Sequence, residues 1–191
     1  MCSKKNIEVT SSPLVTVLLA VYNGGEALIN AIESVTLQSY PNWELIVVDD
    51  CSMDSSLETA KNFSNQDKRI NIIALKENVG LTKALNIGMK NATGEFMARI
   101  DHDDIWYKDK LKIQVDFLVS NLDFDIIGSQ AMYSIKTISE KRDRLTKLPC
   151  SYMEIRQRFT YGNPFIHSAI LLRASVIKDV GGYDERFKFA Q

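Results

Sequence analysis

The stretch LVTVLLAVYN, residues 14–23, decides the fold class of this chain of 191 residues. Residues 14–21 form a short, β-branched and nearly all apolar run, which is typical of a strand covered on both faces in a parallel sheet. An Asn-Gly-Gly turn at 23–25 ends the run. Three similar apolar runs follow along the chain, at 44–48, 70–75 and 95–100.

Apolar residues at helical spacing separate these runs. The spacing predicts helices over 26–37, 55–65 and 81–90. Strand and helix therefore alternate at the length of βαβ units. This predicts an α/β fold, Rossmann-like, with a mixed and mainly parallel sheet flanked by helices.

The second half of the chain does not keep this rhythm. We expect, in order, a helix over 109–118, a strand over 125–133, a charged exposed stretch at 141–144, a helix over 151–160, a strand over 168–172 and a short helix over 174–180.

Composition indicates one globular domain, with 45% hydrophobic and 25% charged residues. The net charge of −1 gives no reason to expect nucleic acid as a partner. The apolar run at 14–21 is too short to cross a bilayer, and the polar segment 1–12 is interpreted as a flexible arm. The number of cysteines is odd and none form a Cys-x-x-Cys pair, which favours a reduced, cytoplasmic setting: Cys2, Cys51 and Cys150.

Acidic residues gather directly after the run at 95–100, in the order Asp101, His102, Asp103, Asp104. Carboxylates in this pattern suit Mg²⁺ or Mn²⁺, which take substrate phosphates as further ligands. A cap for the following helix is the other interpretation. Because ligands bind outside the carboxyl ends of parallel strands, the position of these acids favours a metal site. Zinc is disfavoured, since no second His or Cys stands at ligand spacing.

Four other polar residues are candidates for the same sheet edge. Asp50 could accept a hydrogen bond from a ribose or a base, or cap a turn. Tyr22 could stack on a base, or be a half-buried packing residue. Lys83 could reach a phosphate or remain solvated, and His167 could face an acceptor or be structural.

Taken together, five segments of the chain resemble the inverting family 2 glycosyltransferases, which have the GT-A fold. They occur in the family's order at 16–23, 47–52, 78–88, 92–104 and 181–187, and the resemblance covers 14–191. It implies one GT-A domain over 13–191, with a nucleotide-binding half at about 13–107 and an acceptor-side half at about 108–191.

The resemblance also implies roles for individual residues. Nucleotide contacts fall on Ala20, Tyr22, Asp50, Lys83 and Asp101. Asp103 and Asp101 are the implied metal ligands, with Asp104 behind them, and His167 lies on the acceptor side. The implied reaction transfers a sugar from a nucleotide-sugar donor, often a UDP-sugar, to a hydroxyl of a carbohydrate or lipid-linked acceptor, assisted by Mn²⁺ or Mg²⁺. Bacterial surface polysaccharide or glycoconjugate synthesis is the implied setting.

In this family a general base follows the stretch that corresponds to 181–187. The chain ends at Gln191, about where that Asp is expected, and Asp184 is a weak substitute. We therefore expect a truncated chain that binds donor but is impaired in transfer. A part beyond Gln191 could also attach a cytoplasmic protein to the inner face of the membrane.

Two alternatives remain open at this stage. A noncatalytic nucleotide- or sugar-binding module would share the cavity but not the reaction. A nucleotidyltransferase is less favoured, because residues 22–26 after the first strand carry no Lys or Arg. A Rossmann dehydrogenase is disfavoured by the lack of a Gly-x-Gly-x-x-Gly motif.

Overall fold

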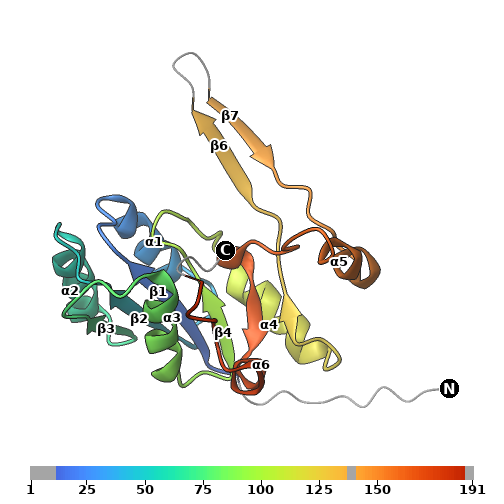
Figure 1. The fold of residues 1–191 in the computed structure, drawn as a ribbon, viewed down its shortest axis with the longest axis horizontal. Coiled ribbons are helices and arrows are strands. Elements are labelled where there is room, and N and C mark those ends of the chain that lie inside the picture. The colour runs from blue at the N-terminus through green and yellow to red at the C-terminus, as the bar shows by residue number, and fades with distance from the viewer. Residues whose placement is uncertain (1–11, 137–140, 188–191) are drawn as a thin grey trace.

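A six-stranded sheet forms the centre of the computed structural model, which describes residues 12–136 and 141–187 (Figure 1). Its strand order is β3-β2-β1-β4-β8-β5. The parallel strands are β1 (Val15–Val21), β2 (Trp43–Asp49), β3 (Ile70–Ala74) and β4 (Phe96–Arg99). The antiparallel strands are β8 (Leu171–Arg173), which pairs with β4, and β5 (Ile126–Ile127), which pairs with β8. The predicted mixed, mainly parallel sheet is confirmed.

Helices lie between the strands in the first half of the chain, as the apolar spacing predicts. The helices are α1 (Ala27–Thr36), α2 (Ser56–Gln66), α3 (Leu81–Lys90), α4 (Lys110–Ser120), α5 (Tyr152–Arg158) and α6 (Ala174–Val180), with one 3-10 turn, η1 (His167–Ala169).

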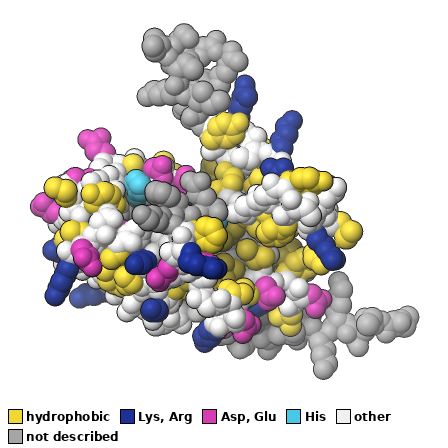
Figure 2. Space-filling model, in the orientation of Figure 1, with side chains coloured by type: hydrophobic (Ala, Val, Ile, Leu, Met, Phe, Trp, Pro, Cys, Tyr) yellow, Lys and Arg dark blue, Asp and Glu magenta, His cyan; other side chains and the backbone are white. Residues whose placement is uncertain are grey.

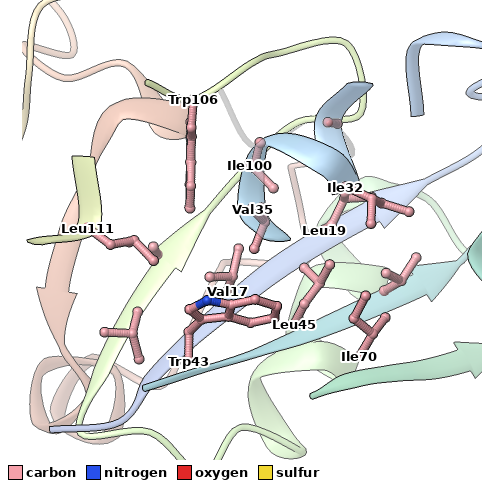
Figure 3. Close-up of a cluster of buried hydrophobic side chains, with 14 of the residues drawn as sticks. Val17, Leu19, Ile32, Val35, Trp43, Leu45, Ile70, Ile100, Trp106 and Leu111 are labelled. Atoms are coloured by element: carbon pink, nitrogen blue, oxygen red, sulfur yellow. The ribbon is translucent and has the colours of Figure 1, made fainter. Parts of the chain in front are cut away.

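Strand β1 is buried along its whole length because both of its faces are covered. Side chains alternate between the faces of a strand. Val17 and Leu19 belong to the larger apolar cluster, which α1, α2 and α4 cover (Figure 3). Leu18 and Ala20 belong to the smaller cluster under α3. Burying each large aliphatic side chain contributes about 1.5–3 kcal/mol, so both layers stabilise the central strand.

The predicted strand over 125–133 is wrong. Only Ile126–Ile127 pair with β8, because β8 has three residues before α6 begins and offers no longer ladder. The chain then leaves the sheet and forms a separate hairpin of β6 (Met132–Lys136) and β7 (Lys141–Leu145), which projects from the body in Figure 1. The stretch predicted as charged and exposed is thus a hairpin strand, and its residues 143–144 are exposed.

The predicted strand over 168–172 is shifted. It begins as the 3-10 turn η1 and becomes extended only at Leu171. Of the predicted arm at 1–12, only Ser12 lies within the described residues, and its hydroxyl donates a hydrogen bond to Tyr40 Oη at 2.9 Å.

Exposed apolar side chains are most frequent in the second half of the chain. In Figure 2 they gather on the right-hand part of the molecule, where Figure 1 places α4, α5 and the base of the hairpin. Helix α5 has no buried residue, and Tyr152, Met153, Phe159 and Tyr161 are exposed around it.

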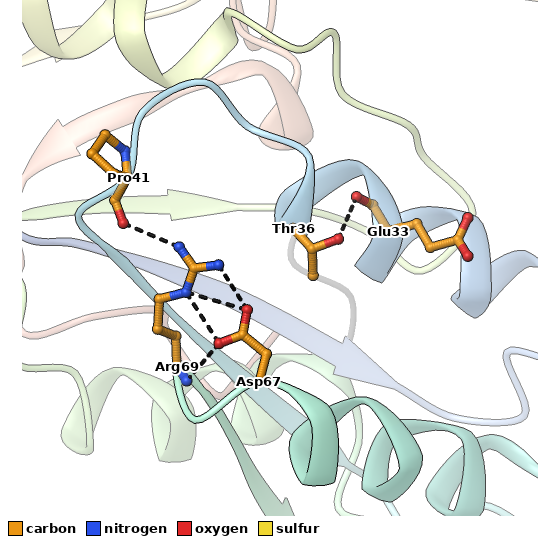
Figure 4. A network of polar contacts seen from close by, with 5 residues as sticks. All are labelled: Glu33, Thr36, Pro41, Asp67 and Arg69. Carbon is orange, nitrogen blue, oxygen red and sulfur yellow. Dashed lines mark hydrogen bonds and ion pairs between the residues drawn. The ribbon is translucent and has the colours of Figure 1, made fainter.

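An ion pair between Arg69 and Asp67 lies at the end of the sheet where β3 begins (Figure 4). Arg69 binds Asp67 through Nε and NH2, the latter at 2.7 Å, and NH1 donates to the backbone oxygen of Pro41 at 3.1 Å. The Arg69 guanidinium also lies 3.7 Å from the centre of the Trp43 ring. This network is remote from the carboxyl ends of the strands, where the candidate site lies.

Candidate active site

A cavity of about 640 Å³ opens at the carboxyl edge of the parallel strands. It is lined by the end of β1, the residue after β2, the start of α3, the loop after β4 and the loop before η1. The lining residues are Ala20, Val21, Tyr22, Asp50, Asn78, Gly80, Leu81, Ala84, Arg99, Asp101, His102, Asp103, Asn163, Phe165 and His167. The sheet edge thus brings most of the sequence-predicted site residues into one space.

Lys83 is the predicted nucleotide contact that does not line this cavity. It lies in the first turn of α3, and its side chain is exposed. Its neighbours Leu81 and Ala84 are the residues of that helix that face the cavity. The structure therefore separates Lys83 from the other candidates.

Asp50 ties the end of β2 to the start of α3. Its Oδ1 accepts the N–H of Val79 at 2.7 Å and its Oδ2 accepts the N–H of Gly80 at 2.9 Å, while the residue is only 3% exposed. Gly80 has φ 88°, a conformation that favours glycine. The capping role left open by the sequence is present, and a carboxylate oxygen can accept a second hydrogen bond from a ligand.

Tyr22 stands at the mouth of the cavity with 45% of its surface exposed. The turn after it is held by one side chain of the loop after β2 and by one at the start of α2. Asn23 N–H donates to Ser52 Oγ at 3.0 Å, and Gly24 N–H donates to Ser56 Oγ at 2.9 Å. Tyr22 is therefore half-buried, and part of its surface stays accessible to a ligand. A flat aromatic face at a cavity mouth is suited to stacking on a base.

The acidic loop after β4 is fixed from three sides. The N–H of Asp101 donates to Ser168 Oγ at 3.0 Å, and Asp101 Oδ1 accepts from Arg99 Nε at 2.8 Å. The His102 ring packs on Gly24, where an added Cβ would lie 3.2 Å from His102 Cδ2. The loop is thus anchored to η1, to β4 and to the turn after β1.

Burial raises the pKa of the Asp104 carboxyl above its ordinary value, and the negative charges of Asp101 and Asp103 act in the same direction. A hydrogen bond from Ser168 and the charge of Arg99 oppose these effects. Three carboxyl groups within four positions therefore repel one another, and a bound cation would relieve that repulsion.

The residues present suit a hard divalent cation as half of its ligand set. Asp101 and Asp103 both line the cavity, and the described residues contain no group of three His, Cys, Asp or Glu placed to hold a metal. Mg²⁺ and Mn²⁺ are commonly bound by one or two carboxylates together with substrate phosphates. Asp103, which is exposed, and Asp101 are the residues that would hold such an ion.

Arg99 is a site residue that the sequence analysis missed. Its guanidinium is buried, ion-paired with Asp101 at 2.8 Å, and its NH1 lies 3.0 Å from His167 Nδ1. A signal was present, since an arginine interrupts the apolar run at 95–100, and a buried charge requires a partner.

A buried polar layer lies under the acidic loop. Trp106 Nε1 donates to the oxygen of Ser168 at 2.7 Å, and Gln114 Nε2 donates to the oxygen of Ala169 at 2.8 Å. Lys110 Nζ donates to Gln114 Oε1 at 2.9 Å and lies 3.9 Å from the centre of the Trp106 ring. Burial lowers the pKa of Lys110 to about 7.

The segment after α6 is attached to α3. Asn86 Oδ1 accepts the N–H of Tyr183 and its Nδ2 donates to the oxygen of Tyr183, both at 2.9 Å. Thr82 Oγ1 donates to the oxygen of Phe187 at 2.6 Å. Asp184, in this segment, does not line the cavity, and its hydrogen bonds with Arg186 lower the pKa of its carboxyl. A paired carboxylate of low pKa is a weak base.

Comparison with known proteins gives this arrangement a family. The family model described as "Glycosyl transferase family 2" matches residues 16–181. The chain belongs to glycosyl transferase family 2. The predicted family resemblance is therefore confirmed.

Bacterial relatives agree with this assignment. The chain is 34% identical over 174 residues to EpsE of Bacillus subtilis strain 168, which is named as a glycosyltransferase. The matched region covers 91% of this chain and 61% of EpsE. It is 39% identical over 107 residues to TuaG of the same organism, named for teichuronic acid biosynthesis, with 56% of this chain and 42% of TuaG covered. The chain thus spans about half of the length of such relatives.

Solved structures confirm the GT-A fold. S. aureus TarS, in a complex with UDP, superposes with a TM-score of 0.70 at 24% identity. The superposition covers 92% of this chain and 52% of the TarS chain. The mannosyltransferase PcManGT from Pyrobaculum calidifontis, in complex with GDP-Man and Mn²⁺, gives a TM-score of 0.69 at 19% identity, with 92% and 49% covered. Within the described part of this chain, no helix has the length and apolarity needed to span a bilayer.

Proposed function

We propose that this family 2 chain forms the donor site of a glycosyltransferase that moves a sugar from a nucleotide-sugar, a UDP-sugar, to an acceptor hydroxyl with inversion. The observation that carries the proposal is the convergence of Tyr22, Asp50, Asp101 and Asp103 on one cavity at the carboxyl edge of the sheet. The UDP-GlcNAc complex of TarS, which has the same fold, supports a nucleotide-sugar as ligand.

The cavity offers a distinct chemistry at each wall. The partly exposed Tyr22 would stack on the base, and Asp50 would accept a hydrogen bond from the base or ribose. Asp103 and Asp101 would hold Mn²⁺ or Mg²⁺, which, when bound, neutralises charge on a departing diphosphate. Asp104, behind them, would add negative charge without touching the ligand.

The acceptor wall contains His167, and the general base is proposed to lie beyond Gln191. In support, Asn86 and Thr82 fasten residues 183–187 to α3, the helix whose Leu81 and Ala84 line the cavity. Phe187, the last described residue, is therefore held beside the helix that lines the cavity. The paired Asp184 is the weaker candidate.

The biological setting is proposed from the relatives' names. TuaG is named for teichuronic acid biosynthesis, which supports a role in bacterial surface polysaccharide or glycoconjugate assembly on a carbohydrate or lipid-linked acceptor. We place the protein in the cytoplasm, at the inner face of the membrane. A noncatalytic nucleotide- or sugar-binding module is the second candidate, favoured by the ion pairing of Asp184 among the described residues.

Calorimetric titration with UDP, with and without Mn²⁺, tests the proposal. In the wild type, Mn²⁺ should tighten UDP binding at least tenfold, a free-energy difference of about 1.4 kcal/mol. Asp103→Asn should abolish this gain, because the exposed carboxylate is lost. Asp123→Asn, which removes an exposed acid after α4, is the matched control and should keep the gain. Equal UDP affinity under all conditions would rule out the metal role of Asp103.

Transfer needs a separate measurement. Release of free sugar from a UDP-sugar, or transfer by a chain extended beyond Gln191, distinguishes an enzyme from a binding module. Equal transfer by the 191-residue chain and the longer chain would show that no base beyond Gln191 is required.

A further inference from the structure

We infer that Arg99 is a positioning residue that fixes two walls of the cavity together: it holds Asp101 by one carboxylate oxygen and keeps His167 in the tautomer whose proton is on Nε2. His167 is then a hydrogen-bond donor toward a ligand and not the general base. The identity of that ligand rests on the proposed function, whereas the tautomer of His167 does not.

Arg99 is the last residue of β4 and is built into the sheet. Its backbone pairs with Leu18 of β1, and the residue is only 5% exposed. A guanidinium stays charged and has five donor N–H groups but no acceptor. Burying it without acceptors is strongly unfavourable, so its partners are required for this conformation.

Asp101 is the first of these partners. Arg99 Nε and NH2 both lie 2.8 Å from the same oxygen, Oδ1. Over the described ranges, 12–136 and 141–187, no donor reaches Oδ2. Arg99 thus orients the carboxylate by one oxygen and leaves the other for a ligand.

His167 is the second partner, and here the chemistry of the donor decides the protonation. Arg99 NH1 lies 3.0 Å from Nδ1 of His167. Because a guanidinium can only donate, Nδ1 must accept and cannot carry a proton. The neutral ring therefore has its proton on Nε2. A charged imidazolium would place an N–H group against the N–H of Arg99.

Asn163 lies beside the nitrogen of His167 that carries this proton. Asn163 Oδ1 accepts the N–H of Phe165 at 3.0 Å, and its Nδ2 lies 3.2 Å from His167 Nε2. In this orientation two N–H donors face each other, which is a poor hydrogen bond. An oxygen of a ligand in the cavity, from a sugar hydroxyl or a phosphate, can accept a hydrogen bond from the Nε2 proton. Asn163 and His167 both line that cavity.

The protonation of His167 also bears on the general base. A base must accept a proton from the acceptor hydroxyl. With Nδ1 bound to Arg99 and Nε2 already protonated, His167 has no lone pair to offer to the cavity. His167 therefore binds the ligand, and a carboxylate abstracts the proton.

Nitrogen NMR of the imidazole rings tests this directly, at a fixed pH of about 7.5, without metal or nucleotide. The chain has two histidines, so His102→Gln assigns the signals of His167. We expect Nδ1 of His167 to be an unprotonated acceptor and Nε2 to carry the proton. In Arg99→Met the signals should change to those of a mixture of tautomers. A proton on Nδ1 in the wild type, or unchanged signals in Arg99→Met, would overturn the inference.

UDP titration in the presence of Mn²⁺ tests whether Arg99 orients Asp101 for ligand binding. Arg99→Met should weaken UDP binding at least tenfold, because Asp101 loses its orientation. Arg99→Lys should recover part of the UDP affinity but should not restore the wild-type NMR signals of His167. One ammonium group cannot contact both Asp101 and His167. Loss of affinity in Arg99→Met with unchanged His167 signals would show that the two walls are not coupled.

Arg69→Met is the matched control. Arg69 also pairs with an aspartate two residues away, Asp67, but at the opposite end of the sheet. Arg69→Met should lower the free energy of unfolding and change neither the His167 signals nor the UDP affinity. If Arg99→Met does not fold, Arg99→Lys carries the same NMR test. If the wild type binds no UDP, the proposed function fails, while the NMR result still decides the tautomer.

Discussion

Ser168 and Asp101 are joined by a hydrogen bond of 3.0 Å from the Asp101 N–H to the Ser168 hydroxyl, across 67 positions of sequence. The bond connects the loop after β4 to η1. Through it, the turn that carries His167 and the loop that carries the acids are held as one unit. The cavity therefore depends on contacts between the two halves of the chain.

Ser168→Ala should destabilise the protein and loosen the acidic loop. The side chain is buried, and its loss leaves the Asp101 N–H without its acceptor, which costs about 1–3 kcal/mol. Urea unfolding followed by circular dichroism measures the change. Ser55→Ala is the control, because Ser55 makes no side-chain cap bond at the start of α2. A change in the free energy of unfolding of the same size in both variants would contradict this role for Ser168.

Gly24→Ala should be more harmful than Gly25→Ala. An added Cβ at Gly24 would lie 2.7 Å from Val21 Cγ2 and 3.2 Å from His102 Cδ2, so the turn or the His102 ring must move. We expect a loss of about 1–3 kcal/mol from overpacking and weaker UDP binding with Mn²⁺. At Gly25 no atom lies within 4 Å of an added Cβ, and only the Gly25 φ of 55° would cause strain. Thermal unfolding and UDP titration of both variants would reveal the difference, and a larger loss of UDP affinity in Gly25→Ala would contradict it.

Lys110 should make the protein more stable as the pH rises from about 7 toward 10.5. Burial lowers its pKa from 10.5 to about 7, so within this range the unfolded chain holds a proton that the folded chain does not. One such proton gives a slope of about 1.4 kcal/mol per pH unit in the free energy of unfolding. The Trp106 ring, 3.9 Å from Nζ, favours the charged form and reduces the effect.

Denaturant unfolding of Lys110→Met between pH 7 and 10 measures that slope against the wild type. The rise with pH contributed by Lys110 should disappear in the variant. Lys112→Met is the control on the same helix, because Lys112 is exposed and pairs with Asp116, which raises its pKa. Parallel curves for wild type and Lys110→Met would show that Lys110 keeps its proton in the folded protein.

Asn86→Ala should release the segment that contains Tyr183 from α3. The side-chain amide bonds both the N–H and the oxygen of Tyr183, and removing both bonds costs about 1–3 kcal/mol. Hydrogen exchange at 183–187 should become faster, and transfer by a longer chain should fall more than UDP binding does. Asn91→Ala, which removes one exposed bond to the Ile87 oxygen, is the control. Unchanged exchange in Asn86→Ala would show that other contacts hold the segment.

Much of the fold follows from local patterns in the sequence. The apolar run of β1 and the helical spacing of α1 and α3 predict their elements to within one residue at each end, because a strand covered on both faces needs apolar residues throughout and a helix repeats every 3.6 residues. The rule for parallel sheets then places Tyr22 and the acids after β4 at one edge, and the structure brings them to one cavity.

Tertiary structure decided the remaining features. The short pairing of β5 with β8 and the contact of Arg99 with His167 depend on segments far apart in sequence, and no local period encodes such contacts. The capping of α3 by Asp50 likewise appears only in the tertiary structure, where its two oxygens accept the amides of Val79 and Gly80. The residue types at the sheet edge follow from the sequence. Which of them support one another and which face the cavity depends on packing, because a buried charge is stabilised by partners that folding alone brings near.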